Sequence, residues 1–80
     1  MPRYRKESSH GAEEIIKRAR AFFGPGGIGL EIKDEGQCCI AFEGGGGHVH
    51  IDAVSKEKGS DIEIETREWD YQVREFLKKI

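Results

Sequence analysis

Residues 43–52 read Glu-Gly-Gly-Gly-Gly-His-Val-His-Ile-Asp, and this stretch decides the fold. Four consecutive glycines end one regular element, and the alternation of polar and apolar residues after them is typical of a strand. In a strand, side chains two positions apart point to the same face. We therefore expect His48, His50 and Asp52 to form one polar row, with the apolar residues between them facing a core.

The same alternation recurs on both sides of the glycines. It covers residues 28–33, 38–43 and 61–66, besides 48–53 itself. Short turn sequences separate these segments: residues 34–37, the glycine run and residues 55–60. Four period-two segments joined by short turns predict a four-stranded antiparallel meander with one buried face and one solvent-facing face.

One amphipathic helix is predicted on each side of the meander. The apolar residues of each helix recur at spacings of three, four and seven residues, which is the helical period. Gly24 and Pro25 end the first helix, since glycine accepts the terminal left-handed conformation and proline cannot continue a helix. The two apolar stripes are Ile15, Ile16, Ala19, Phe22 and Phe23, and Trp69, Val73, Phe76, Leu77 and Ile80.

These elements define an α+β fold, a two-layer sandwich in which an N-terminal and a C-terminal helix pack on one face of the sheet. Residues 1–9 are polar and aperiodic and are expected to form a flexible tail, which leaves 10–80 as a single domain. The predicted core comprises Ile15, Ala19, Phe22, Phe23, Leu30, Ile32, Ile40, Phe42, Val49, Ile51, Ile62, Ile64, Trp69, Val73, Phe76 and Leu77.

This order of a first helix, an antiparallel meander and a last helix resembles a shortened frataxin-type sandwich. A long C-terminal helix on a curled sheet also resembles the helix-grip ligand binders. The likeness is one of architecture, so it transfers no residue role and no function to this chain.

The composition restricts the classes of function. Eighty residues make one domain, and a net charge of −2 provides no basic field for nucleic acid or an acidic membrane. No apolar run approaches the roughly 18 residues that cross a bilayer, and no apolar stretch follows the basic start as in a signal peptide. We therefore expect a cytoplasmic protein that binds neither nucleic acid nor membrane. The adjacent Cys38 and Cys39 are expected to be free thiols in a reducing compartment.

Strand pairing sharpens the hypothesis of a metal site on the solvent-facing side. If the glycine run closes a hairpin with Glu43 opposite His48, Ala41 faces His50 and Cys39 faces Asp52. Pairing Ile51 with Ile64 then places Glu65 beside His50 and Glu63 beside Asp52. Two imidazoles with a neighbouring carboxylate could hold Zn²⁺ or Fe²⁺. The candidate ligands are His48, His50, Asp52 and Glu65, and the alternative is an ordinary solvated sheet face.

The glycines are a second candidate site. Residues 24–29 contain G-x-G-x-x-G, but a helix precedes and a strand follows it, the reverse of a phosphate-binding context. Four glycines in one turn carry an entropic cost. Such a cost indicates that something approaches the backbone closely or that the loop moves. The candidate ligand-binding or partner-binding residues are Gly26, Gly27, Gly44, Gly45, Gly46 and Gly47.

Three hypotheses of function compete. The leading one is a small non-catalytic binding or interaction module, which pairs the edge strand at residues 29–33 with a protein partner or a second copy. The second is a small metal-binding protein that uses His48 and His50. The third is a ligand pocket between the helices and the sheet, gated by the glycine loops. No nucleophile with its base and no cofactor motif is present, so an enzyme is not expected.

Overall fold

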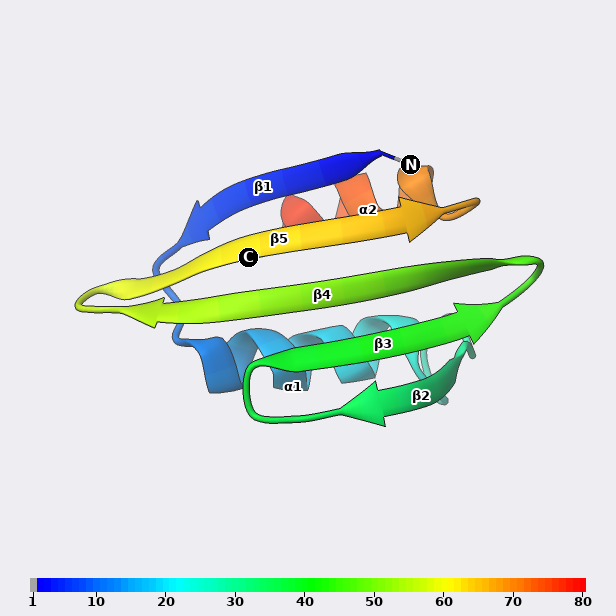
Figure 1. Ribbon diagram of the computed structural model, residues 1–80, viewed down its shortest axis with the longest axis horizontal. Coiled ribbons are helices and arrows are strands. Elements are labelled where there is room, and N and C mark those ends of the chain that lie inside the picture. The colour runs from blue at the N-terminus through cyan, green and yellow to red at the C-terminus, as the bar shows by residue number, and fades with distance from the viewer. Residues whose placement is uncertain (1) are drawn as a thin grey trace.

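A computed structural model describes residues 2–80. The chain forms β1 (Arg3–Ser8), α1 (Ala12–Phe23), β2 (Glu31–Glu35), β3 (Cys39–Gly44), β4 (Gly47–Lys56), β5 (Gly59–Arg67) and α2 (Asp70–Leu77). The five strands make one antiparallel sheet in the order β1-β5-β4-β3-β2 (Figure 1). The α+β class and the antiparallel sheet are confirmed, but the predicted count of four strands was wrong.

The additional strand lies in the segment that the sequence predicted to be a flexible tail. β1 pairs with β5 along its whole length, from Arg3 opposite Glu65 to Ser8 opposite Ser60. The Tyr4 hydroxyl donates to Asp70 at 2.8 Å, which raises the pKa of Tyr4, and Lys6 donates to the carbonyl of Leu77. β1 is an edge strand with a single aromatic residue and no apolar row, so its sequence has no hydrophobic periodicity to detect. Met1, the first residue of the predicted tail, lies outside the described residues.

The first predicted strand also begins later than expected. Residues 28–30 do not belong to the sheet, because they close the end of α1. The Ile28 amide donates to the carbonyl of Phe22 at 2.9 Å, and the Leu30 amide donates to that of Phe23 at 2.8 Å. Gly29, at φ 95°, turns the chain between them, so β2 starts at Glu31.

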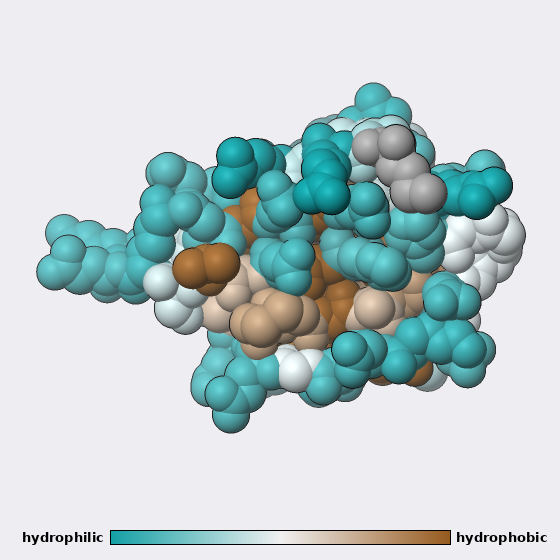
Figure 2. Space-filling view, viewed as in Figure 1, coloured by the Kyte–Doolittle hydropathy of each residue, from teal (hydrophilic) through white to brown (hydrophobic). Residues whose placement is uncertain are grey.

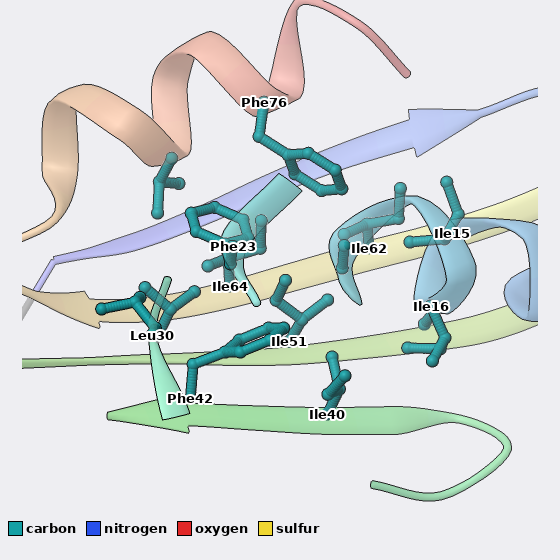
Figure 3. Packing of buried hydrophobic residues seen from close by; sticks show 14 of the residues in the cluster. Ile15, Ile16, Phe23, Leu30, Ile40, Phe42, Ile51, Ile62, Ile64 and Phe76 are labelled. Atoms are coloured by element: carbon teal, nitrogen blue, oxygen red, sulfur yellow. The ribbon is translucent and has the colours of Figure 1, made fainter. Parts of the chain in front are cut away.

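Both helices pack on the same face of the sheet, as predicted, and the other face is left open (Figure 1). Phe23 of α1 and Phe76 of α2 place their rings 5.3 Å apart, and Phe42 of β3 lies 5.5 Å from Phe23. These side chains and the isoleucines around them fill the space between the layers (Figure 3). Within residues 2–80, no helix has the length and apolar character needed to cross a membrane.

The observed core matches most of the predicted one. In the described range 2–80, fifteen hydrophobic side chains are buried: Ala12, Ile15, Ile16, Ala19, Phe23, Leu30, Ile40, Phe42, Val49, Ile51, Ala53, Ile62, Ile64, Val73 and Phe76. Four predicted members (Phe22, Ile32, Trp69 and Leu77) lie at the margin and are only partly buried. The prediction omitted Ala12 and Ile16 of α1 and Ala53 of β4, which are also buried.

The tetraglycine run forms the tight hairpin between β3 and β4. Gly44 pairs with Gly47, and Gly45 and Gly46 have φ of 59° and 81°. Positive φ at both central residues is the pattern of a type I′ turn, which matches the twist of the flanking strands. A Cβ atom on Gly45 would lie 2.7 Å from the Trp69 ring. The close approach that the sequence indicated is therefore made by the chain itself.

Gly47→Ala is expected to destabilise the fold by about 3 kcal/mol, the upper end of the usual cost of overpacking. A Cβ atom at this position would lie 2.0 Å from the carbonyl oxygen of Arg67, so the β4–β5 pairing must shift. Urea denaturation followed by circular dichroism measures the loss. Gly36→Ala is the matched control, because a Cβ atom there has no atom within 4 Å. Equal stabilities of the two variants would contradict the steric argument.

Candidate metal centre on the open face of the sheet

The open face carries the polar row that the glycine-flanked stretch predicted. β4 contributes His48, His50 and Asp52 to this face, and β5 contributes the acidic residues beside them. Figure 2 shows this face, on which hydrophilic side chains surround a narrow strip of more apolar surface. No helix covers it, so its side chains are available to a ligand.

The predicted register is present on both sides of β4. On β3, Glu43 pairs with His48, Ala41 pairs with His50, and Cys39 pairs with Asp52. On β5, Glu65 pairs with His50 and Glu63 pairs with Asp52. The register follows from the alternation, because a slip of one residue would move every apolar side chain of β4 from the core to solvent.

Three side chains converge between β4 and β5 and form the candidate metal centre: His48, His50 and Glu65. Nε2 of His48 lies 3.7 Å from Oε1 of Glu65, and Nδ1 of His50 lies 3.8 Å from the same oxygen. All three candidate ligand atoms lie within 4.8 Å of one another. Two ligands bound at 2.0–2.1 Å in a tetrahedral site are about 3.4 Å apart, so small side-chain movements would close this group around an ion.

The Nε2 atom of His48 is the most unusual atom of the group. It is buried and has no hydrogen-bond partner among residues 2–80, although the imidazole side chain as a whole is 17% exposed. A buried polar nitrogen without a partner costs on the order of 1–3 kcal/mol. The neighbouring Glu65 oxygen is too distant for a hydrogen bond. A metal ion bonded to Nε2 would satisfy this atom.

The orientation of Glu65 depends on a residue that sequence reasoning missed. Nη2 of Arg3 lies 3.6 Å from Oε2 of Glu65, while its Nη1 donates to Oε1 of Glu63 at 3.1 Å. Arg3 therefore holds one oxygen of Glu65 and leaves the other directed at the histidines. Partners of this kind orient metal ligands in many proteins. Arg3 was not considered a site residue because β1 was expected to be a tail.

Asp52, the fourth predicted ligand, lies outside the group. It faces Glu63 two pairs further along the strands and lines a different hollow, together with Cys39 and Arg5. The residue spacing alone could not distinguish Asp52 from Glu65, because both share the face of the histidines. The side-chain directions separate them.

The candidate glycines fall into two places. Gly44, Gly46 and Gly47 line a hollow of about 460 Å³ beside His48 and His50, so the hairpin forms one wall next to the candidate metal centre. Gly26 and Gly27 lie in the connection after α1 and are not among the residues that line this hollow. A Cβ atom on Gly27 would lie 2.3 Å from the carbonyl oxygen of Phe22, so the helix end explains this glycine.

The expectation of two free thiols was wrong. Cys38 and Cys39 are joined by a disulfide. The prediction assumed that both residues lie in a strand and point to opposite faces. Cys38 instead lies in the turn before β3, which begins at Cys39, so strand alternation does not separate the two sulfurs.

Comparison with known proteins adds no relative to this description. No protein-family model, no curated protein and no solved structure matches the chain. The functional argument therefore rests on the geometry of the open face.

Proposed function

We propose that the protein is a small binding protein whose ligand is a divalent transition metal, held by His48, His50 and Glu65. One observation carries the proposal: three candidate ligand atoms from two paired strands converge within 4.8 Å, and one of them is a buried nitrogen without a hydrogen-bond partner among residues 2–80. Two imidazoles and a carboxylate suit Zn²⁺, and the same donor set binds Fe²⁺ in non-haem iron proteins.

The leading expectation from the sequence, pairing of the first meander strand with a partner, has less support. The corresponding edge strand β2 is only five residues long, and four of them are charged: Glu31, Lys33, Asp34 and Glu35. Its register shifts between Ile32 and Asp34, which marks a bulge. Short length, charges and bulges are the features by which edge strands avoid pairing with other chains.

A ligand pocket between the helices and the sheet also has less support. The aromatic rings of Phe23, Phe42 and Phe76 meet in that layer, and all three side chains are at most 1% exposed. A domain of this size has little core to give up for a cavity. The hollow that adjoins the histidines lies on the open face instead.

The proposal is tested by NMR of the imidazole groups while Zn²⁺ is added to chelator-stripped protein. We expect saturable shifts of His48 and His50 near one equivalent of metal, with His10 unchanged because it lies outside the group. A parallel anaerobic titration with Fe²⁺ distinguishes the two metals. Unchanged histidine spectra at several equivalents of both metals would overturn the proposal.

Arg3→Gln is expected to weaken metal binding by about 10- to 100-fold, the usual effect of removing a group that orients a ligand. The amide cannot hold Glu65 by charge, so the carboxylate loses its fixed direction. Competition with a chromophoric chelator measures the affinity, and Arg3→Lys should restore part of it. Arg5→Gln is the matched control, since Arg5 contacts Glu63 at 3.5 Å from the same face of β1. Equal losses in both arginine variants would show that Arg3 acts only through general charge.

A further inference from the structure

We infer that the metal-loaded centre also binds a small oxyanion, which bridges the ion and the guanidinium of Arg67. This inference rests on the proposed metal-binding function and names the ligand that completes the site. The proposed ligand is a small molecule that carries a carboxylate or phosphate group.

The position of Arg67 carries the first step. Arg67 is the last residue of β5 and the direct cross-strand partner of His48. It follows Glu65 by two residues, so it shares the open face with the metal centre. Arg67 is exposed and lines the hollow of about 460 Å³ together with His48 and His50. Arg67 therefore lines the same hollow as two of the proposed metal ligands, and the hollow is large enough for a small molecule.

The balance of charge carries the second step. Arg67 makes no ion pair with any residue in the range 2–80, whereas Lys33 in the same hollow is paired with Glu31 at 3.3 Å. A divalent ion would add two positive charges, of which Glu65 neutralises one. Glu43 is the remaining acid in the hollow, but it lies on β3, and Arg67 lies two strands away on β5. Glu43 also pairs with His48, so it can balance the second charge of the ion, and the charge of Arg67, about 10 Å away across the strands, is then left without an acid in the hollow.

The coordination chemistry carries the third step. Three protein ligands leave at least one position of a tetrahedral ion open. A carboxylate or phosphate can bond to the ion through one oxygen, and the remaining oxygen of the carboxylate, or two remaining oxygens of the phosphate, can accept two hydrogen bonds from a guanidinium. Arginine makes this planar two-point contact, and lysine, a point charge, does not. The site is therefore expected to prefer oxyanions over neutral ligands of the same size.

The test uses protein loaded with Co²⁺, whose visible absorption reports the ligands on the ion. Inorganic phosphate and acetate are titrated separately into wild-type protein, Arg67→Gln and Arg67→Lys. We expect a saturable spectral change in the wild type, an anion affinity at least about 10-fold lower in Arg67→Gln, and an intermediate affinity in Arg67→Lys. The affinity for Co²⁺ should change less than about 3-fold across the series. The anion that binds with the higher affinity indicates whether the natural ligand carries a phosphate or a carboxylate.

Four results would overturn the inference, and they separate it from the proposed function. Failure to bind Co²⁺ would overturn both the proposed metal-binding function and the oxyanion inference. Binding of Co²⁺ with a spectrum insensitive to both anions removes the inference and leaves the metal centre. Equal anion affinity in wild type and Arg67→Gln removes the role of Arg67, and equal affinity in metal-free protein removes the bridge to the ion.

Discussion

His48→Ala is expected to lower the affinity for Zn²⁺ by at least about 100-fold, beyond the 10- to 100-fold effect of removing a partner that merely orients a ligand. The substitution removes one of the three proposed ligands, whose Nε2 atom is buried and has no hydrogen-bond partner among residues 2–80. Competition with a chromophoric chelator measures the change. His10→Ala is the matched control, because it removes an imidazole from the same chain without touching the metal centre.

The same variant gives a second, independent signature in protein stability. A metal that binds only the folded state stabilises it by about 2.7 kcal/mol at a concentration 100 times its dissociation constant. Wild-type protein and His10→Ala should gain this stability on addition of Zn²⁺, and His48→Ala should gain none. In metal-free protein, His48→Ala removes a buried nitrogen that lacks a hydrogen-bond partner among residues 2–80. Removing this unfavourable atom offsets the lost packing, so the variant should lose less stability than is usual for truncating a buried side chain. A Zn²⁺-dependent gain that persists in His48→Ala would contradict the assignment of this ligand.

The central strands could be predicted because their sequences alternate with the period of a strand. In β4, the apolar side chains of Val49, Ile51 and Ala53 are all buried, and only one register with β3 and β5 keeps them so. The same register places Glu65 beside His50, so the hydrophobic pattern alone predicts this neighbour. The part of the site built from central strands was therefore predictable from hydrophobic pattern alone.

The part of the site built from the edge was not predictable in this way. β1 reads Arg-Tyr-Arg-Lys-Glu-Ser, and its two inward positions before Ser8 are Tyr4 and Lys6. Tyr4 satisfies its hydroxyl on Asp70, and Lys6 reaches a helix-end carbonyl, so polar atoms anchor the strand where apolar ones would normally do so. A charged strand of this kind looks like a tail in sequence. Because this segment was predicted to be a tail, Arg3, which contacts Glu65, was not predicted as a site residue.

Phe42→Ala is expected to destabilise the protein by about 3–5 kcal/mol, the usual cost of deleting a fully buried phenylalanine side chain. Phe42 has no exposed surface, and its ring lies 5.5 Å from that of Phe23, so it holds α1 against the sheet. Domains of this size have roughly 5–15 kcal/mol of stability in total, so a large share of the variant should be unfolded at low denaturant.

Urea denaturation of Phe42→Ala and of the control Tyr71→Ala measures this loss. Tyr71 is 67% exposed, and its removal should change stability by less than about 0.5 kcal/mol.

Phe42→Ala also connects the core to the proposed metal centre, because Phe42 and the proposed ligand His48 lie on paired strands one position out of register. If metal binds only the folded state, saturating Zn²⁺ should refold part of the Phe42→Ala population, by the same 2.7 kcal/mol or so at 100 times the dissociation constant. A core variant that loses stability but gains none from Zn²⁺, while wild type does, would show that the metal centre requires α1 to be firmly packed.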